Sequence, residues 1–190
     1  MDTTYFPILM KQLTEFGERF MANRMLTSSM LLFYFGVALW LGGLMFFGFG
    51  VAGTLFTSLP SRDIAGAVNR AILSRLTILE YLGGCFIIGG LLIHNRKEKG
   101  IVWKLPFIMI GIMLTLLVVY SIIIGSQMNT LVSNISSFDH PQEQDKDLIA
   151  GFTSLHHLYS SLVKLNLFLG FVLFVWQTLL YSLPNGKKSE

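Results

Sequence analysis

The chain has 190 residues, of which 53% are hydrophobic and 13% are charged, and its formal net charge is +3. A soluble domain usually carries about 25% charged residues, so the composition excludes an ordinary soluble domain and favours one compact membrane domain. The basic residues flank apolar runs instead of clustering on a polar face, which indicates membrane orientation and not nucleic-acid binding. The one cysteine, Cys85, excludes an intrachain disulfide.

The N-terminal segment, residues 1–24, has the spacing of an amphipathic helix. Its apolar positions recur at steps of three and four: Phe6, Leu9, Leu13, Phe16 and Phe20. We expect this helix to lie on the cytoplasmic membrane surface, with a short helix packed against the bundle as the alternative. The apolar run that follows is too long for a cleaved signal and predicts an uncleaved anchor.

Four apolar runs are each long enough to cross a bilayer, which takes about 20 apolar residues. They cover residues 30–56, 72–93, 105–124 and 155–180. The sequence therefore predicts an all-α integral membrane protein, a four-transmembrane-helix bundle with an N-terminal amphipathic helix. The membrane domain spans residues 25–183, and a polar tail covers 184–190.

The basic residues give this bundle an orientation. An even number of spans puts both termini and the connection between spans 2 and 3 on one side, which holds nine Lys and Arg, against four on the other. The side richer in Lys and Arg is normally cytoplasmic. We therefore expect both termini in the cytoplasm, in a bacterial inner membrane or its equivalent.

The first span carries small residues on one helical face. Gly36, Trp40, Gly43 and Gly50 recur at helical spacing, and glycine lets neighbouring helices approach closely in lipid. This pattern predicts a helix-packing face. The alternative is a groove for a flat ligand or another subunit.

Two ionisable residues lie deep inside apolar runs, where charge is costly and therefore marks a candidate site. Spans 2 and 4 run parallel, and Glu80 and Lys164 lie at similar depths from the outer side. We expect them to form an ion pair that either fixes helix register or lines a polar path. Each continues a polar stripe that could form an outward-facing vestibule, made of Arg70, Ser74, Thr77, Tyr81, His157 and Ser161.

Two adjacent histidines, His156 and His157, precede Lys164 in the last apolar run. His156 and His157 point about 100° apart on a helix, so at most one faces the core. Imidazole is a common metal and haem ligand, yet the surrounding spacing matches no metal signature. The sequence shows no cofactor signature, and haem b or a metal held by His156 or His157 stays open as an alternative.

The run Trp40–Phe56, WLGGLMFFGFGVAGTLF, is followed by Leu59-Pro60-Ser61 and Ala65-Gly66, and Phe152 and Leu155-His156 precede the last span. This pattern resembles the family of unknown-function membrane proteins that includes eukaryotic transmembrane protein 205. The resemblance implies a four-helix integral membrane protein; the eukaryotic members are linked to platinum-drug resistance. The Trp-Gly-Gly portion is also distantly similar to copper resistance protein D, which implies metal or haem handling.

Three readings of function follow. The first is a non-enzymatic membrane protein, a scaffold or accessory subunit of a membrane complex, whose partners are the bilayer and either a second copy or another membrane protein. The second is a small transporter or a proton or ion path that uses Glu80 and Lys164. The third is a haem- or metal-binding membrane protein. The sequence contains no nucleophile elbow, phosphate loop, CxxC pair or HExxH motif, which favours the first reading.

Overall fold

The computed structural model describes residues 5–94 and 101–182, and over these ranges its regular structure is helical. Four helical segments are long and apolar enough to cross a membrane: Met10–Ser58, Arg62–His94, Ile101–Asn134 and Glu143–Ser182. The predicted all-α, four-span fold class is confirmed in these terms.

The elements follow one another with few interruptions. The first rod comprises α1 (Tyr5–Val37), η1 (Ala38–Gly42), α2 (Gly43–Met45), η2 (Phe46–Val51) and α3 (Ala52–Ser58). It is followed by α4 (Arg62–His94), then α5 (Ile101–Val118), η4 (Val119–Ile124) and α6 (Gly125–Asn134), and finally η5 (Glu143–Asp145) and α7 (Lys146–Ser182). The segments η1, η2 and η4 are π-helical, and η5 is a single 3-10 turn.

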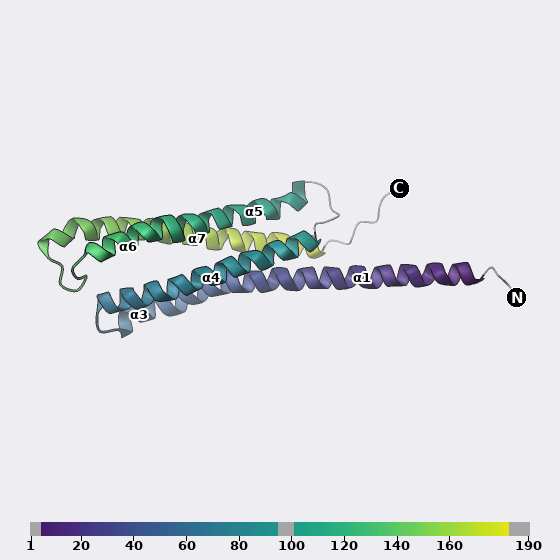
Figure 1. Ribbon diagram of the computed structural model, residues 1–190, viewed down its shortest axis with the longest axis horizontal. Coiled ribbons are helices and arrows are strands. Elements are labelled where there is room, and N and C mark those ends of the chain that lie inside the picture. The colour runs from purple at the N-terminus through teal and green to yellow at the C-terminus, as the bar shows by residue number, and fades with distance from the viewer. Residues whose placement is uncertain (1–4, 95–100, 183–190) are drawn as a thin grey trace.

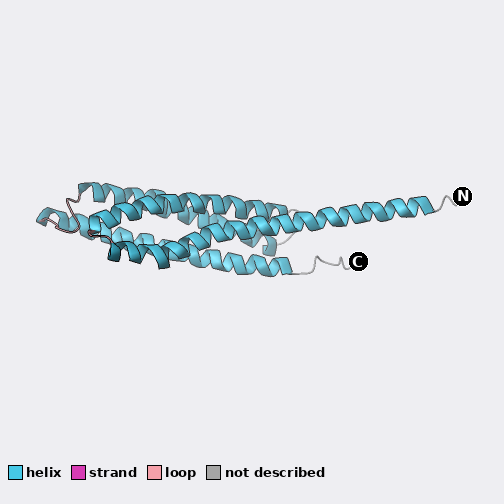
Figure 2. Ribbon diagram, turned by 90° about the horizontal axis from the view of Figure 1, so that it is seen from below, coloured by secondary structure: helices cyan, strands magenta, loops and turns pink. Residues whose placement is uncertain are grey.

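The long helices form two hairpins (Figure 1). One pairs the first rod with α4, and the other pairs α5 and α6 with α7. The start of α1 and the end of α7 lie toward one end of the bundle, which we call the terminal end. The turn at 59–61 and the loop at 135–142 lie at the other end, the loop end (Figures 1 and 2). The two hairpins diverge toward the loop end.

The tightest helix contact joins α1 to α4 through glycines. A Cβ built on Gly36 would lie 2.6 Å from the carbonyl oxygen of Gly83, and one on Gly83 would lie 2.8 Å from the carbonyl oxygen of Gly36. About two turns further along α4, a Cβ on Gly90 would lie 2.7 Å from the carbonyl oxygen of Ser29. The two backbones therefore touch directly, the arrangement that small residues permit between helices.

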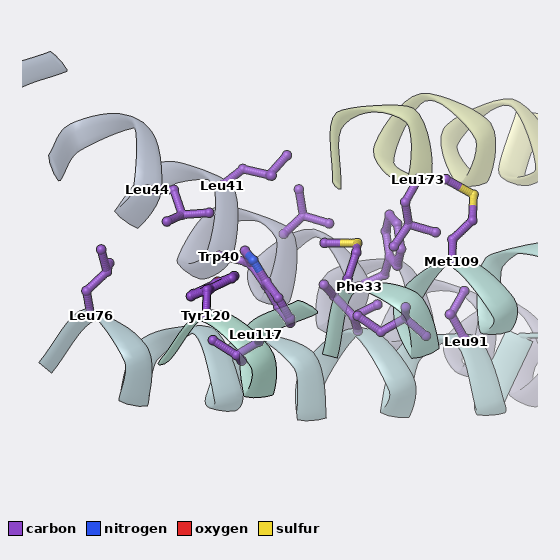
Figure 3. Packing of buried hydrophobic residues seen from close by; sticks show 14 residues of the cluster. Phe33, Trp40, Leu41, Leu44, Leu76, Leu91, Met109, Leu117, Tyr120 and Leu173 are labelled. Atoms are coloured by element: carbon purple, nitrogen blue, oxygen red, sulfur yellow. The ribbon is translucent and has the colours of Figure 1, made fainter. Parts of the chain in front are cut away.

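A core of large apolar side chains fills the space between the hairpins (Figure 3). Trp40 of the first rod lies beside Tyr120 and Leu117, and all three are fully buried. Phe33 and Leu173 continue the core toward the terminal end. The buried face of each helix is narrow, and many large apolar side chains point outward, as expected of helices surrounded by lipid.

The N-terminal prediction differs from the structure at its boundary. The helix α1 runs without a break through residue 24 into the first apolar run, so residues 5–24 are an extension of the same rod and project past the other helices (Figure 1). The surface location expected for this segment stays a prediction. Residues 1–4 and the predicted tail 184–190 lie outside the described residues.

Candidate functional site

A cleft of about 660 Å³ lies at the loop end, between α4, α6 and the first turns of α7. Small-molecule sites in proteins commonly have volumes of about 300–1,000 Å³. The cleft is partly open and is lined by residues from both hairpins and from the loop that joins α6 to α7. Its lining residues include Arg62, Gly66, Arg70, Ser74, Thr77, Ser121, Met128, Val132, Phe152, His156 and Tyr159.

Two aspartates join the start of α4 to the loop across the cleft. The carboxylate of Asp139 accepts hydrogen bonds from the backbone N–H groups of Arg62 (2.9 Å) and Asp63 (3.4 Å). The carboxylate of Asp63 in turn accepts from the hydroxyl of Ser137 (2.7 Å) and the N–H of Phe138 (2.8 Å). Each aspartate thus satisfies backbone donors that the other segment leaves free, which ties the diverging hairpins together.

The same contacts set the charge of Asp139. The hydrogen bond from the Arg62 N–H is the leading cause that lowers the pKa of this carboxyl below its usual value, and the N–H of Asp63 adds to it. Asp139 is therefore ionised at neutral pH and remains a strong acceptor at the first turn of α4. A helix N-terminus favours such a negative charge.

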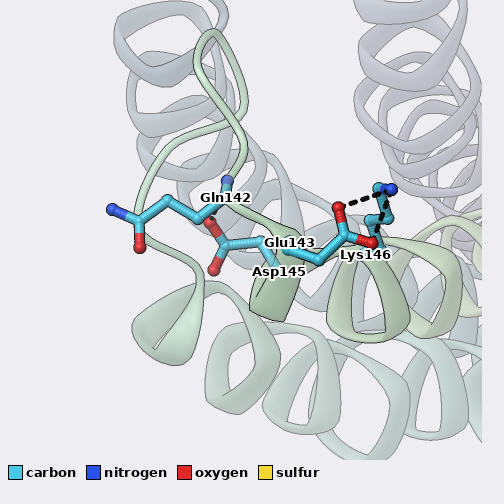
Figure 4. A network of polar contacts seen from close by, with 4 residues as sticks. All are labelled: Gln142, Glu143, Asp145 and Lys146. Atoms are coloured by element: carbon cyan, nitrogen blue, oxygen red, sulfur yellow. Dashed lines mark hydrogen bonds and ion pairs between the residues drawn. The ribbon is translucent and has the colours of Figure 1, made fainter.

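A second, buried aspartate fixes the other side of the loop (Figure 4). Asp145 accepts from the N–H groups of Gln142 (2.9 Å) and Ser136 (3.2 Å) and from the Ser136 hydroxyl (3.3 Å). Beside it, Lys146 and Glu143 form an exposed ion pair at 2.7 Å. An exposed pair adds little stability, so Asp145 is the residue that gives the loop its shape.

The mouth of the cleft is cationic. Arg62 and Arg70 line it, and both side chains are exposed. A guanidinium nitrogen of Arg70 lies 3.9 Å from the position of a Cβ built on Gly66, so the side chain extends back over the preceding turn toward the loop end. Within residues 5–94 and 101–182 neither arginine takes part in an ion pair, since the pair found there is Lys146–Glu143.

The deeper walls are largely apolar, and the hydroxyl groups of Thr77 and Ser121 already have partners. Thr77 donates to the Leu73 carbonyl at 3.0 Å, and Ser121 donates to the Leu117 carbonyl at 2.5 Å. These two hydroxyls are bonded to their own helices and are not free for a ligand. Asn69, which also lines the cleft, has a buried side-chain oxygen with no hydrogen-bond partner among the described residues. Tyr159 closes the floor and packs edge-on against Tyr120 with ring centroids 5.4 Å apart.

Below this floor lies a buried polar cluster. Tyr120 donates its hydroxyl to the carboxyl of Glu80, which is 2% exposed. The amide nitrogen of Asn166 donates to the Tyr120 oxygen at 3.3 Å and to the Met113 carbonyl at 3.1 Å. The cluster links α4, η4 and α7, and Tyr159 separates it from the cleft.

The predicted pairing of Glu80 with Lys164 is corrected by this arrangement. Glu80 is buried and bonded to Tyr120, whereas Lys164 is exposed, and the two do not form an ion pair. The physical reason is rotation about α7. Lys164 precedes Asn166 by two residues, which is about 200° around a helix, so the side that turns Asn166 inward turns Lys164 outward.

The predicted polar stripe is divided. Arg70, Ser74 and Thr77 line the cleft, and so does His156. Tyr81 is half-buried against the core and is not among the lining residues. On α7, His157 and Ser161 are exposed and do not line the cleft; the Ser161 hydroxyl donates to the His157 carbonyl at 2.8 Å.

The two histidines therefore have different surroundings. His156 lies at the cleft and stacks on Phe152 with ring centroids 6.1 Å apart, while His157 points away from it. Over the described residues, no three His, Cys, Asp or Glu side chains come together in a way that could hold a metal ion. A ligand role for His156 would need donors from outside that set.

Three of the four residues of the predicted packing face lie against α4. Gly36 touches Gly83, Trp40 packs beside Gly83 and Gly84, and a Cβ on Gly43 would lie 2.8 Å from a methyl carbon of Leu76. Gly50 does not follow them: it is exposed, and a Cβ there would meet the ring of Phe46 at 3.7 Å. Gly50 lies in η2, whose wider π turn changes which side chains share a face.

Sequence reasoning did not identify several residues that build the site. Tyr120 was not singled out, although it and Ser121 interrupt an otherwise apolar run and so carried a signal. The glycines of α4 at 83, 84 and 90 repeat the pattern noted in the first span. The link between Asp63 and Asp139 had no signal, because the two lie far apart in the sequence.

Comparison with known proteins gives a family but no activity. A model of a domain of unknown function, DUF4149, matches residues 35–135, just over half of the chain. No curated protein and no solved structure matches the chain. The matched region includes the α1–α4 contact, Glu80, Tyr120 and most of the α4 and α6 walls of the cleft. The chain therefore belongs to the DUF4149 family.

Proposed function

We propose that this chain is a non-enzymatic integral membrane protein that binds a small molecule in a cleft at its loop end, as an accessory subunit or scaffold of a membrane complex. The observation that carries the proposal is the cleft at the loop end. It is of ligand size, and two independent sets of hydrogen bonds hold its rim: Asp63 with Asp139, and Asp145 with Ser136. A shaped rim on diverging hairpins suits reversible binding.

The four long apolar helices support a location in the bilayer, and the nine-to-four distribution of Lys and Arg supports cytoplasmic termini in a bacterial inner membrane. In this orientation the cleft faces the opposite, outer side. The bilayer itself is then one partner. A second copy of the chain or another membrane protein is the other, and nucleic acid is not among them.

Two relationships remain part of this proposal. The run Trp40–Phe56 supports kinship with the family that includes eukaryotic transmembrane protein 205. Its first residues support a more distant kinship with copper resistance protein D. Of the described residues that line the cleft, His156 is the histidine that a ligand set would use.

The test uses a variant that fills the cleft. Gly66 lines the cleft and a Cβ there meets only Arg70, at 3.9 Å, so Gly66→Phe places a ring in the cleft without a backbone clash. Gly111→Phe is the matched control, because Gly111 is an exposed helical glycine outside the cleft with nothing within 4 Å of its Cβ position. The wild type and both variants are extracted in native-membrane nanodiscs, and their bound small molecules are identified by native mass spectrometry.

We expect a small molecule that stays bound to the wild-type protein and to Gly111→Phe and is lost from Gly66→Phe. The same bound molecules in the same amounts on all three proteins would overturn the proposal. So would a wild-type protein that retains none.

A further inference from the structure

We propose that the cleft binds a single-chain anionic amphiphile, with its head group at Arg62 and Arg70 and its chain along the apolar walls below. This rests on the proposed function, that the cleft is a ligand site, and adds the chemical class of the ligand. The shared chemistry is a carboxylate or phosphate on one alkyl chain.

The charges at the mouth fit an anion. Arg62 and Arg70 carry two positive charges there, and within the described residues they have no ion-pair partner. Asp63 is the acidic residue that lines the cleft, and its two oxygens accept hydrogen bonds from the loop at Ser137 and Phe138. The carboxylate is thus directed toward the loop, while the guanidinium groups remain free for a ligand. Guanidinium binds carboxylate and phosphate oxygens in a paired geometry.

The walls below the mouth fit an alkyl chain. Leu73 of α4, Met128 and Val132 of α6 and Phe152 of α7 face the cleft from different helices. The hydroxyls of Ser74, Thr77 and Ser121 each donate to a carbonyl of their own helix, at 2.8, 3.0 and 2.5 Å. A chain that covers these three residues therefore leaves each of their hydroxyl donors paired.

The dimensions also fit one chain. Lining residues on α4 extend from Arg62 to Thr77, about 22 Å at 1.5 Å per residue. This length suits an extended medium-length alkyl chain, and a volume of about 660 Å³ suits one such chain with its head group.

The position of the cleft along the bundle matches the orientation of an amphiphile in a bilayer. Arg62 and Arg70 precede the apolar run 72–93 and so lie at head-group depth, where arginine is favoured. Thr77 and Tyr159 lie deeper, within the apolar zone. A lipid-like molecule in the outer leaflet would thus have its charge and its chain at the levels that the cleft offers.

The experiment measures equilibrium binding of radiolabelled dodecanoate and dodecyl phosphate to the full chain in phosphatidylcholine nanodiscs, with empty nanodiscs subtracted. Dodecanol, dodecyltrimethylammonium and inorganic phosphate test the need for negative charge and for the chain. The variants are Arg62→Gln, Arg70→Gln and Gly66→Phe. Arg75→Gln is the control, because Arg75 is exposed on the same helix and does not line the cleft.

We expect both anionic amphiphiles to compete for one site. Each single Arg→Gln change should weaken binding about threefold to tenfold, since a charged hydrogen bond at an exposed site contributes less than an enclosed one. Arg75→Gln should bind like the wild type, and the neutral, cationic and chain-free compounds should bind at least about tenfold more weakly. Tighter binding of dodecyl phosphate than of dodecanoate would identify a phosphate head group. Tighter binding of dodecanoate would identify a carboxylate.

The outcomes separate this inference from the proposed function. Binding that Gly66→Phe abolishes but neither arginine change affects would place the ligand in the cleft and overturn the anionic head group. Preferential binding of dodecanol or of dodecyltrimethylammonium would overturn it as well. Binding that all variants share equally would lie outside the cleft and would overturn both proposals.

Discussion

Replacing Gly36 by alanine should separate α1 from α4. The added Cβ would lie 2.6 Å from the Gly83 carbonyl oxygen and 2.7 Å from the Ile87 backbone nitrogen. Neither atom can rotate away, because both belong to the backbone of α4. Restoring the shorter distance to the 3.4 Å of ordinary contact requires a movement of about 0.8 Å between the two helices.

The size of the effect follows from two opposing contributions. Overpacking of a well-packed contact costs about 1–3 kcal/mol, whereas alanine stabilises a helix over glycine by about 0.5–1 kcal/mol. We expect Gly36→Ala to lower the free energy of unfolding by about 0.5–2 kcal/mol, the difference between these contributions. Gly89→Ala, on α4 with nothing within 4 Å of its Cβ, should be neutral or slightly stabilising.

The assay is reversible unfolding in mixed micelles titrated with sodium dodecyl sulfate, followed by circular dichroism. The midpoint for Gly36→Ala should fall below that of the wild type, and the midpoint for Gly89→Ala should not. Equal midpoints for the two alanine variants would refute the direct backbone contact between α1 and α4.

Three further predictions concern the loop end and its orientation. The fold lowers the pKa of Asp139, so this residue contributes stability above the ordinary aspartate pKa of about 3.9, and the contribution is lost as the pH falls through the lowered value. Asp139→Asn should therefore lower the melting temperature at neutral pH, and its melting temperature should fall less steeply with acid than that of the wild type. An equally steep fall in acid would contradict the assignment. Tyr120→Phe removes the donor to buried Glu80 and should cost about 1–3 kcal/mol in the same detergent titration, an effect that should shrink in a Glu80→Leu background. A variant in which Cys85 is replaced carries single new cysteines for labelling in whole cells. His140→Cys, in the exposed loop at the loop end, should react with an impermeant maleimide, and Glu18→Cys should react only after permeabilisation. The opposite pattern would reverse the proposed orientation.

The sequence predicted the features that depend only on how deep each residue lies in the bilayer. Four apolar runs of sufficient length, joined in alternating directions, fix the order of the hairpins and the end at which each connection lies. The cost of burying an ionisable group likewise drew attention to Glu80, which is buried as that argument requires.

The depth of a residue in the bilayer does not show which way its helix is rotated about its own axis. Lys164 and Asn166 have similar depth but face opposite ways, and which of them turns inward depends on how α7 packs. The π-helical segments added a second obstacle, because their wider turn follows no sequence pattern that we recognised; Gly50 was placed by regular spacing across η2 and is exposed. The cleft itself depends on a contact between Asp63 and Asp139, which only the folded chain brings together.

The unbroken course of α1 has a mechanical consequence. Residues 5–28 form about 36 Å of helix beyond the contact at Ser29 and Gly90, at 1.5 Å per residue, and they continue the same rod that carries Gly36 and Trp40. A rod of that length works as a lever: a tilt of about 10° at the glycine contact would displace its far end by about 6 Å. A ligand that changes how the two hairpins meet would therefore move the far end of α1, at the opposite end of the molecule.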